Sequence, residues 1–117
     1  MNIEVFREYC LSKKGVTEDF PFDSVTLVFK VMGKIFALTD VNNFESINLK
    51  CDPEKAIELR EQYPGVRPGY HMNKKHWNTI NNEPPIAHNI LFSWIDHSYE
   101  LVSSGLTKAQ KQVLQTL

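Results

Sequence analysis

One stretch of the sequence, Pro64 to Asn82 (PGVRPGYHMNKKHWNTINN), concentrates side chains that suit contact with a polyanion. It contains no acidic residue, and Arg67, Lys74 and Lys75 give it a formal charge of +3. Histidine titrates near neutrality, so the two histidines of the stretch can add positive charge beside a phosphate group. The basic side chains therefore predict contacts with the phosphates of a nucleic acid.

Aromatic and amide side chains are interleaved with these basic residues. Tyr70 and Trp77 flank the basic cluster, an arrangement that suits stacking or groove insertion next to phosphate contacts. Asn73, Asn78 and Thr79 can hydrogen-bond to base edges or to the nucleic-acid backbone. The alternative interpretation is that Trp77 belongs to the core and that the lysines only solvate a loop, as single charge clusters usually do.

The histidines and cysteines match no standard metal or catalytic pattern. His71 and His76 are separated by four residues in a predicted strand–loop–strand, which is not a metal-ligand spacing. Cys10 and Cys51 lie in no Cys-x-x-Cys pair, and we interpret them as buried, reduced thiols. The sequence has neither a nucleophile elbow nor a phosphate-binding glycine loop. We predict no catalytic residue, no metal and no cofactor.

Length and composition limit the protein to one globular domain, residues 1–117, with 42% hydrophobic residues and a formal charge of −1. A near-neutral total is not that of a polybasic protein, so a nucleic-acid contact must rest on local charge. Because residues 64–82 carry +3, the other 98 residues carry −4. Glu4, Arg7 and Glu8 interrupt the apolar core that a signal peptide needs. We expect a cytoplasmic protein that does not contact a membrane.

Hydrophobic periodicity indicates the elements that position this stretch. Helical spacing of apolar residues predicts a helix over residues 2–13. Alternation predicts strands over 25–31 and 46–51, with polar residues on one side of the later strand. The turn at Met32-Gly33 predicts a return strand over 34–39 between them. Glu18 and Asp19 are interpreted as framing a turn before the first of these strands.

The second half of the chain adds two strands and three helices. Asp52-Pro53 predicts a helix start, and two short extended segments follow at 66–71 and 75–80. A long helix is predicted after Pro84-Pro85, and a last one opens at Thr107. The order α-β-β-β-α-β-β-α-α has connections too short for parallel crossovers. It predicts an α+β fold, a two-layer sandwich on an antiparallel sheet.

Several short segments, in order along nearly the whole chain, resemble one known family. They are FPF at 20–22, GKIFAL at 33–38, LK at 49–50, DP at 52–53, PG at 64–65, HMNKKHW at 71–77, SY at 98–99 and LV at 101–102. The segment at 71–77 is the best single match. The ordered set resembles the MmcQ/YjbR family of small bacterial proteins.

This resemblance implies a CyaY-like or secretion-chaperone-like α+β fold, which agrees with the predicted element order. Members of the family are commonly described as DNA-binding proteins with a "double wing" arrangement, in which β-hairpin regions embrace the duplex. Carried over residue by residue, the resemblance points to His71, Asn73, Lys74, Lys75, His76 and Trp77, with Lys34 and Lys50 as possible contacts to the DNA backbone. Arg67 joins them on the charge argument alone.

Three hypotheses about function follow from these patterns. The first is a DNA-binding module that is weak, led by phosphate contacts and free of catalysis. The second is a protein-interaction or chaperone-like adaptor module, monomeric or weakly homodimeric, although polar residues on the expected outer sheet face disfavour a large obligate interface. The third is a small-molecule-binding protein or enzyme that uses the region of His71 and His76.

Overall fold

The computed structural model describes residues 1–69 and 72–117. Six strands form one sheet in the order β1-β2-β3-β4-β6-β5, and every neighbouring pair is antiparallel. The strands are β1 (Val16–Asp19), β2 (Thr26–Val31), β3 (Lys34–Asp40), β4 (Ser46–Lys50), β5 (Val66–Pro68) and β6 (Trp77–Asn81). The helices are α1 (Ile3–Leu11), α2 (Pro53–Gln62), α3 (His88–Ser104) and α4 (Lys108–Thr116).

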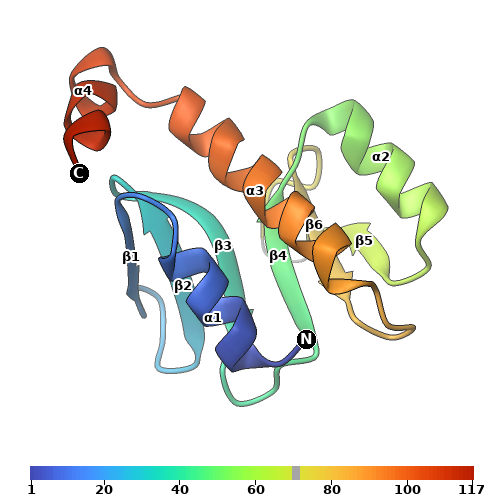
Figure 1. Cartoon of the computed structure of the whole chain (residues 1–117). Coiled ribbons are helices and arrows are strands. Elements are labelled where there is room, and N and C mark those ends of the chain that lie inside the picture. The colour runs from blue at the N-terminus through green and yellow to red at the C-terminus, as the bar shows by residue number, and fades with distance from the viewer. Residues whose placement is uncertain (70–71) are drawn as a thin grey trace.

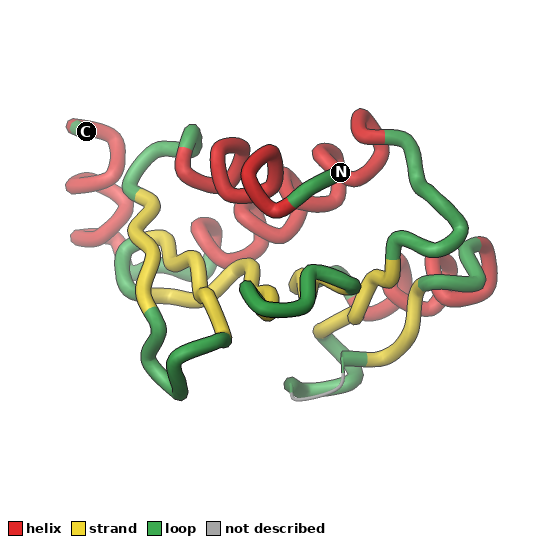
Figure 2. The backbone as a smooth tube through the Cα atoms, turned by 90° about the horizontal axis from the view of Figure 1, so that it is seen from below, coloured by secondary structure: helices red, strands yellow, loops and turns green. Residues whose placement is uncertain are grey.

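The helices and the sheet form two layers, which confirms the predicted α+β fold. Helices α1 and α3 cover one face of the sheet, and α2 lies beside β5 and β6 (Figure 1). Within the part of the chain that the structure describes, no helix covers the opposite face. Figure 2 shows that the β1–β2 loop and the β5–β6 loop both extend on that helix-free side.

The main core lies between the helices and the covered face of the sheet. Alternate residues of each strand point into it, as period-two patterning requires. Phe6 of α1 packs edge-on against Phe29 of β2, with 5.5 Å between the ring centroids. The buried residues that meet there include Phe6, Cys10, Leu27, Phe29, Val31, Phe36, Ala37, Ile47, Leu49, Leu91 and Ile95.

A β-bulge changes the facing of residues along β3. The register of β2 against β3 shifts between Phe29 and Lys30. The extra residue lets Phe36 and Ala37, which are adjacent in sequence, both lie fully buried in the core. Ser98 of α3 satisfies a backbone group at this bulge. Its buried hydroxyl donates to the Phe36 carbonyl at 2.5 Å and accepts from the Lys50 amide at 2.9 Å.

The predicted order lacked one strand, and this is a correction. Residues 16–19 pair with β2 as strand β1, whereas Glu18 and Asp19 were expected only to frame a turn. The segment VTED has no apolar run, so its own sequence does not indicate a strand. Tertiary contacts hold it instead, because Glu18 accepts from Arg7 at 2.8 Å and Asp19 pairs with Lys30 at 3.5 Å.

The other boundaries differ by a few residues from those expected. The first helix is shorter, Ile3–Leu11 rather than 2–13, and the fifth strand ends at Pro68, three residues before the predicted end at 71. Proline has no amide proton to donate, which fits a strand that stops at the edge of the sheet. The sixth strand, β6, covers 77–81 rather than 75–80 because residues 73–76 form a turn.

His97 of α3 fastens the start of α2 to the body of the protein. Its Nε2 accepts a hydrogen bond from the Asp52 amide at 3.2 Å. Burial, together with the nearby Lys55 ammonium, lowers the pKa of His97 below its ordinary value of 6.5. The neutral imidazole is therefore the form that fits the folded state.

Stability is expected to fall as the pH is lowered below about 6.5, the ordinary histidine pKa. Just below pH 6.5, His97 is protonated in the unfolded chain but remains neutral in the folded protein, because folding lowers its pKa. The free energy of unfolding therefore increases as the pH rises toward 6.5 and becomes constant above it. Urea unfolding at pH 7.5 and 5.5 measures the difference. His97→Gln keeps an acceptor that cannot titrate and should flatten the dependence. His88→Gln, on the exposed first turn of the same helix, should leave it intact. A wild-type slope in the His97→Gln variant would contradict this role.

Candidate nucleic-acid interface

The helix-free face of the sheet carries a row of polar side chains across its second half. Thr79 of β6 lies opposite both Asn48 of β4 and Arg67 of β5, so these three residues share one face. Lys50 lies opposite Trp77 one step further along. The register therefore brings the predicted residues Lys50 and Arg67 to the same side of the sheet as the β5–β6 loop.

The Trp77 side chain is buried on this face and is not exposed for contact with a ligand. Its side chain is 7% exposed and packs in a small cluster with Val28 and Leu38, which Ile35 and Met72 border. This cluster lies on the helix-free side and is separate from the main core. Of the two interpretations that the sequence left open, the structure thus places Trp77 in a packed cluster. An indole held there is not available to stack on a base.

The β5–β6 loop presents two lysines on a turn built by Asn73. The Asn73 side-chain oxygen accepts from the Lys75 amide at 2.9 Å, and its carbonyl accepts from the Trp77 amide at 3.0 Å. Asn73 is thus occupied in shaping the turn. Lys74 and Lys75 are exposed at its surface, whereas His76 is half-buried. His71 lies outside the described residues.

Arg60 of α2 hydrogen-bonds to the β5–β6 loop. This residue was not among those predicted from the sequence. Its Nε donates to the Asn78 side-chain oxygen at 2.7 Å, and a terminal nitrogen donates to the Lys74 carbonyl and, at 3.4 Å, to the Trp77 carbonyl. Asn78 is 1% exposed, so it is a buried structural residue and not a reader of bases. No local sequence signal distinguishes Arg60 from an ordinary exposed helix residue.

Lys34 does not join the other predicted contacts. It pairs with Val31, whose side chain belongs to the main core, so the register puts Lys34 on the helix side of the sheet, next to the β2–β3 turn. That turn requires two residues with positive φ, Met32 at 50° and Gly33 at 82°. The predicted residues therefore divide into a group on the helix-free side and Lys34 on the other.

A shallow depression of about 340 Å³ lies on the helix-free face near the start of β2 and β4. Hydroxyl and amide groups are prominent in its lining, and the Thr79 hydroxyl donates to the Asn48 side-chain oxygen at 2.5 Å. Arg67 lines one part of it, and Asp40 and Glu45 line another. Its lining residues are Thr26, Leu38, Thr39, Asp40, Asn43, Glu45, Ser46, Asn48, Arg67, Pro68 and Thr79.

The β1–β2 loop, residues 20–25, borders the same side with two exposed aromatic rings. Phe20 is 46% exposed and Phe22 is 64% exposed. Asp23 braces the loop, because its carboxylate accepts from the backbone amides of Thr26 at 2.6 Å and Val25 at 2.9 Å. These hydrogen bonds lower the pKa of Asp23. The FPF segment therefore lies in an outward loop that is braced at its far end, residues 23–26.

Charged side chains are distributed unevenly over the molecule. Helices α1, α2 and α3 carry seven carboxylates and three basic side chains, whereas α4 carries two lysines and no carboxylate. On the helix-free side, Lys30 is paired with Asp19 at 3.5 Å. Arg67, Lys50, Lys74 and Lys75 form no salt bridge within residues 1–69 and 72–117. Four basic side chains are thus available on the face that no described helix covers.

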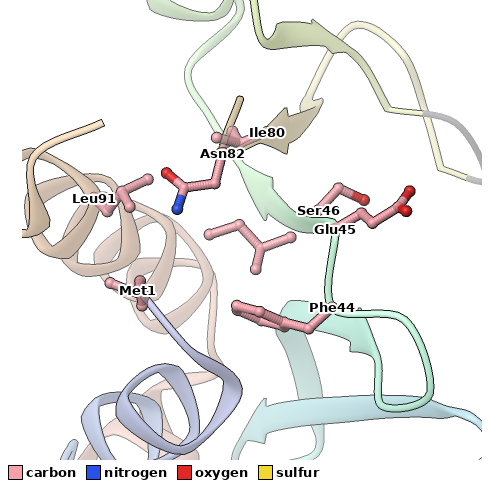
Figure 3. Close-up of a pocket in the computed structure, with 8 residues that line it drawn as sticks. Met1, Phe44, Glu45, Ser46, Ile80, Asn82 and Leu91 are labelled. Carbon is pink, nitrogen blue, oxygen red and sulfur yellow. The ribbon is translucent and has the colours of Figure 1, made fainter. Parts of the chain in front are cut away.

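The cavity at the chain start and the two buried thiols offer no reactive group in the described residues. Figure 3 shows a cavity between the chain start, α3 and β4, lined by Met1, Phe44 and Leu91, whose volume is about 10 Å³. That volume accommodates one water at most. Burial raises the pKa of Cys51 to about 11 and raises that of Cys10 further, so neither thiol is ionised at neutral pH. Among residues 1–69 and 72–117, no three potential metal ligands gather.

No helix in the described part of the chain combines the length and apolar character needed to cross a membrane.

Comparison with known proteins identifies relatives along the whole chain. The uncharacterized protein YbdF of Escherichia coli O157:H7 is 43% identical over 96 residues, which cover 80% of this chain and 79% of that protein. The uncharacterized protein YjbR of Escherichia coli K12 is 30% identical over 118 residues and covers all of both chains. The uncharacterized protein YyaQ of Bacillus subtilis is 32% identical over 104 residues, 76% of this chain and 87% of that one.

Solved structures show the same fold. The crystal structure of Deinococcus radiodurans protein DR2400, a DUF419 domain, superposes with a TM-score of 0.89 at 39% identity, over 97% of this chain and 88% of that one. A Pseudomonas syringae protein superposes with a TM-score of 0.72 at 31% identity, over 87% of this chain and 99% of that one. A family model described as YjbR matches residues 11–101. These matches confirm the resemblance found in the sequence: the chain belongs to the YjbR family.

Proposed function

We propose that this protein is a nucleic-acid-binding module that binds DNA weakly, mainly through phosphates, and carries out no catalysis. The observation that supports this most is the gathering of Arg67, Lys50, Lys74 and Lys75 on the helix-free side, none of them in a salt bridge within the described residues. Helices α1, α2 and α3 carry an excess of carboxylates, but α4 carries two lysines, and Asp40 and Glu45 lie on the helix-free side. Attraction of a polyanion therefore rests on the local basic cluster and not on the net charge of −1.

The spacing of the four basic residues suits contacts along a strand of phosphates. Lys74 and Lys75 lie on the turn that Asn73 closes, while Lys50 and Arg67 lie on the sheet beside it. Phosphate contacts of this kind fix position and give little sequence preference. The free cysteines, Cys10 and Cys51, fit the reducing cytoplasm, which we propose as the location of this binding.

The salt dependence of binding tests the proposal. If Arg67, Lys50, Lys74 and Lys75 each neutralise one phosphate of a duplex, log K should fall with log salt at a slope of about −3.6. Lys74→Ala/Lys75→Ala should reduce that slope to about −1.8 and weaken binding at low salt. Fluorescence anisotropy of a labelled duplex at a series of salt concentrations measures both quantities.

Matched controls come from lysines elsewhere on the protein. Lys108→Ala/Lys111→Ala on α4 removes the same charge away from the proposed face, and Lys34→Ala removes a lysine from the helix side of the sheet. Both variants should keep a slope close to that of the wild type. The proposal fails if no duplex binds at low salt, or if the Lys74/Lys75 variant and the Lys108/Lys111 variant behave alike.

A further inference from the structure

Two phenylalanines of the β1–β2 loop, Phe20 and Phe22, are exposed to solvent. Phe22 at 64% and Phe20 at 46% exposure are unusual, because burying a phenylalanine ring is favourable by about 1.5–3 kcal/mol. The loop is nonetheless held in place by the three hydrogen bonds that the Asp23 carboxylate accepts from Val25 and Thr26. Next to this braced turn, the two rings present flat apolar surfaces to solvent.

The surroundings of these rings favour a nucleic acid over an apolar protein surface. The loop extends on the same side as the basic β5–β6 loop (Figure 2), and the sheet between them holds a depression rich in hydroxyl and amide groups. Asn48, Ser46 and Arg67 in that lining offer hydrogen-bond donors and acceptors that suit base edges. An apolar partner would instead cover the Arg67 guanidinium without supplying a hydrogen bond, which is unfavourable.

We propose that the helix-free face binds unpaired bases, with Phe22 and Phe20 as stacking platforms and the depression beside them receiving base edges. The inference rests on the proposed nucleic-acid function and narrows its ligand to single-stranded or locally opened DNA. Bases of a closed duplex are stacked on each other and expose no faces to the rings, whereas an unpaired base has a free π-face.

The dimensions of the sheet suit a short segment of strand. From β2 to β6 there are three strand spacings, or about 14 Å across the sheet. The register puts the aromatic loop and the basic loop at opposite strand ends, four residues or about 13 Å apart along the strands. The diagonal of about 19 Å corresponds to roughly six nucleotides at ~3.4 Å per stacked nucleotide. Phosphates at one end would meet Lys74 and Lys75 while bases at the other end meet the phenylalanines.

The experiment compares a labelled ten-nucleotide single strand with the duplex of the same sequence, at the same low salt. The single strand is expected to bind more tightly. Phe22→Ala should weaken its binding roughly tenfold, the loss expected for one stacked base. The salt slope should not change, because no phosphate contact is removed. Phe22→Trp should restore binding, since an indole stacks at least as well.

Val113→Ala on α4 is the matched control, because Val113 is an apolar side chain of similar exposure, 50%, away from the face. Melting temperatures of all variants confirm that the fold is kept. The inference is overturned if the duplex binds as tightly as the strand, or if Phe22→Ala binds the strand like the wild type, in which case the rings serve another partner such as a protein. Absence of binding to both probes would instead reject the proposed function itself.

Discussion

Arg60→Met is expected to lower the free energy of unfolding by about 3 kcal/mol, since hydrogen bonds to a charged group contribute about 1.5–3 kcal/mol each. The guanidinium links α2 to the Asn78 side chain and to two carbonyls of the β5–β6 segment. Methionine keeps the apolar stem but removes every donor. The Asn78 oxygen, in a side chain that is 1% exposed, then has no remaining partner in the described structure.

Urea unfolding monitored by tryptophan fluorescence measures this loss. Arg60→Lys keeps the charge without the planar fork, so it should recover only part of the stability. Arg7→Ala is the matched control: Arg7 also makes a bidentate pair, with Glu18, but at the surface, where such pairs contribute little. Equal unfolding midpoints for the Arg60→Met and Arg7→Ala variants would show that the Arg60 network does not stabilise the fold.

Arg60→Met also tests whether DNA binding depends on the conformation of the β5–β6 loop as well as on the charge of its lysines. Lys74 and Lys75 remain in Arg60→Met, but the carbonyl of Lys74 loses its link to α2. The salt slope should therefore stay close to that of the wild type while the affinity falls, because the loop must be ordered on binding. Lys74→Ala/Lys75→Ala has the opposite signature, a reduced slope on an intact loop.

The sequence predicts well those elements whose own residues encode them. The alternation of β2 and β4 and the turn at Met32-Gly33 encode the first hairpin and the strand after it, and Asp52-Pro53 starts α2 through hydrogen bonds from the amides of Glu54 and Lys55. Strand β1 escapes prediction because its polar residues form a strand only beside β2. A sequence pattern indicates only the conformation that a segment prefers by itself, and β1 has no such preference because pairing with β2 holds it in place.

The site is less predictable because its parts come from distant positions. The basic residues were found from charge alone, but the division between Lys50 on the helix-free face and Lys34 on the helix side depends on the register and on the bulge in β3. Arg60 acts on a loop 14 residues away, and its role is visible only when α2 is placed against β6. The exposure of Phe22 likewise follows from tertiary packing.

Ser98→Ala is expected to lower the free energy of unfolding by about 3 kcal/mol, because leaving a buried polar group unsatisfied costs about 1–3 kcal/mol. The Ser98 hydroxyl is fully buried and satisfies two backbone groups, the Phe36 carbonyl at the bulge and the Lys50 amide. Alanine removes both hydrogen bonds and offers nothing in exchange. The family resemblance marked this serine in the SY segment without indicating its role.

Ser103→Ala provides the control on the same helix, since the Ser103 hydroxyl donates only to the Glu100 carbonyl at an exposed position. Its effect should stay within about 0.5 kcal/mol, as for most surface substitutions. Urea unfolding of both variants at pH 7.5, above the window in which His97 titrates, isolates the hydrogen-bond contribution. If Ser98→Ala unfolds at the midpoint of Ser103→Ala, the bulge carbonyl and the Lys50 amide find other partners, and α3 is held to the sheet by apolar packing alone. A shifted midpoint would instead show that one hydroxyl ties α3 to the strand that carries Lys50, so that the helical layer fixes a basic residue on the opposite face.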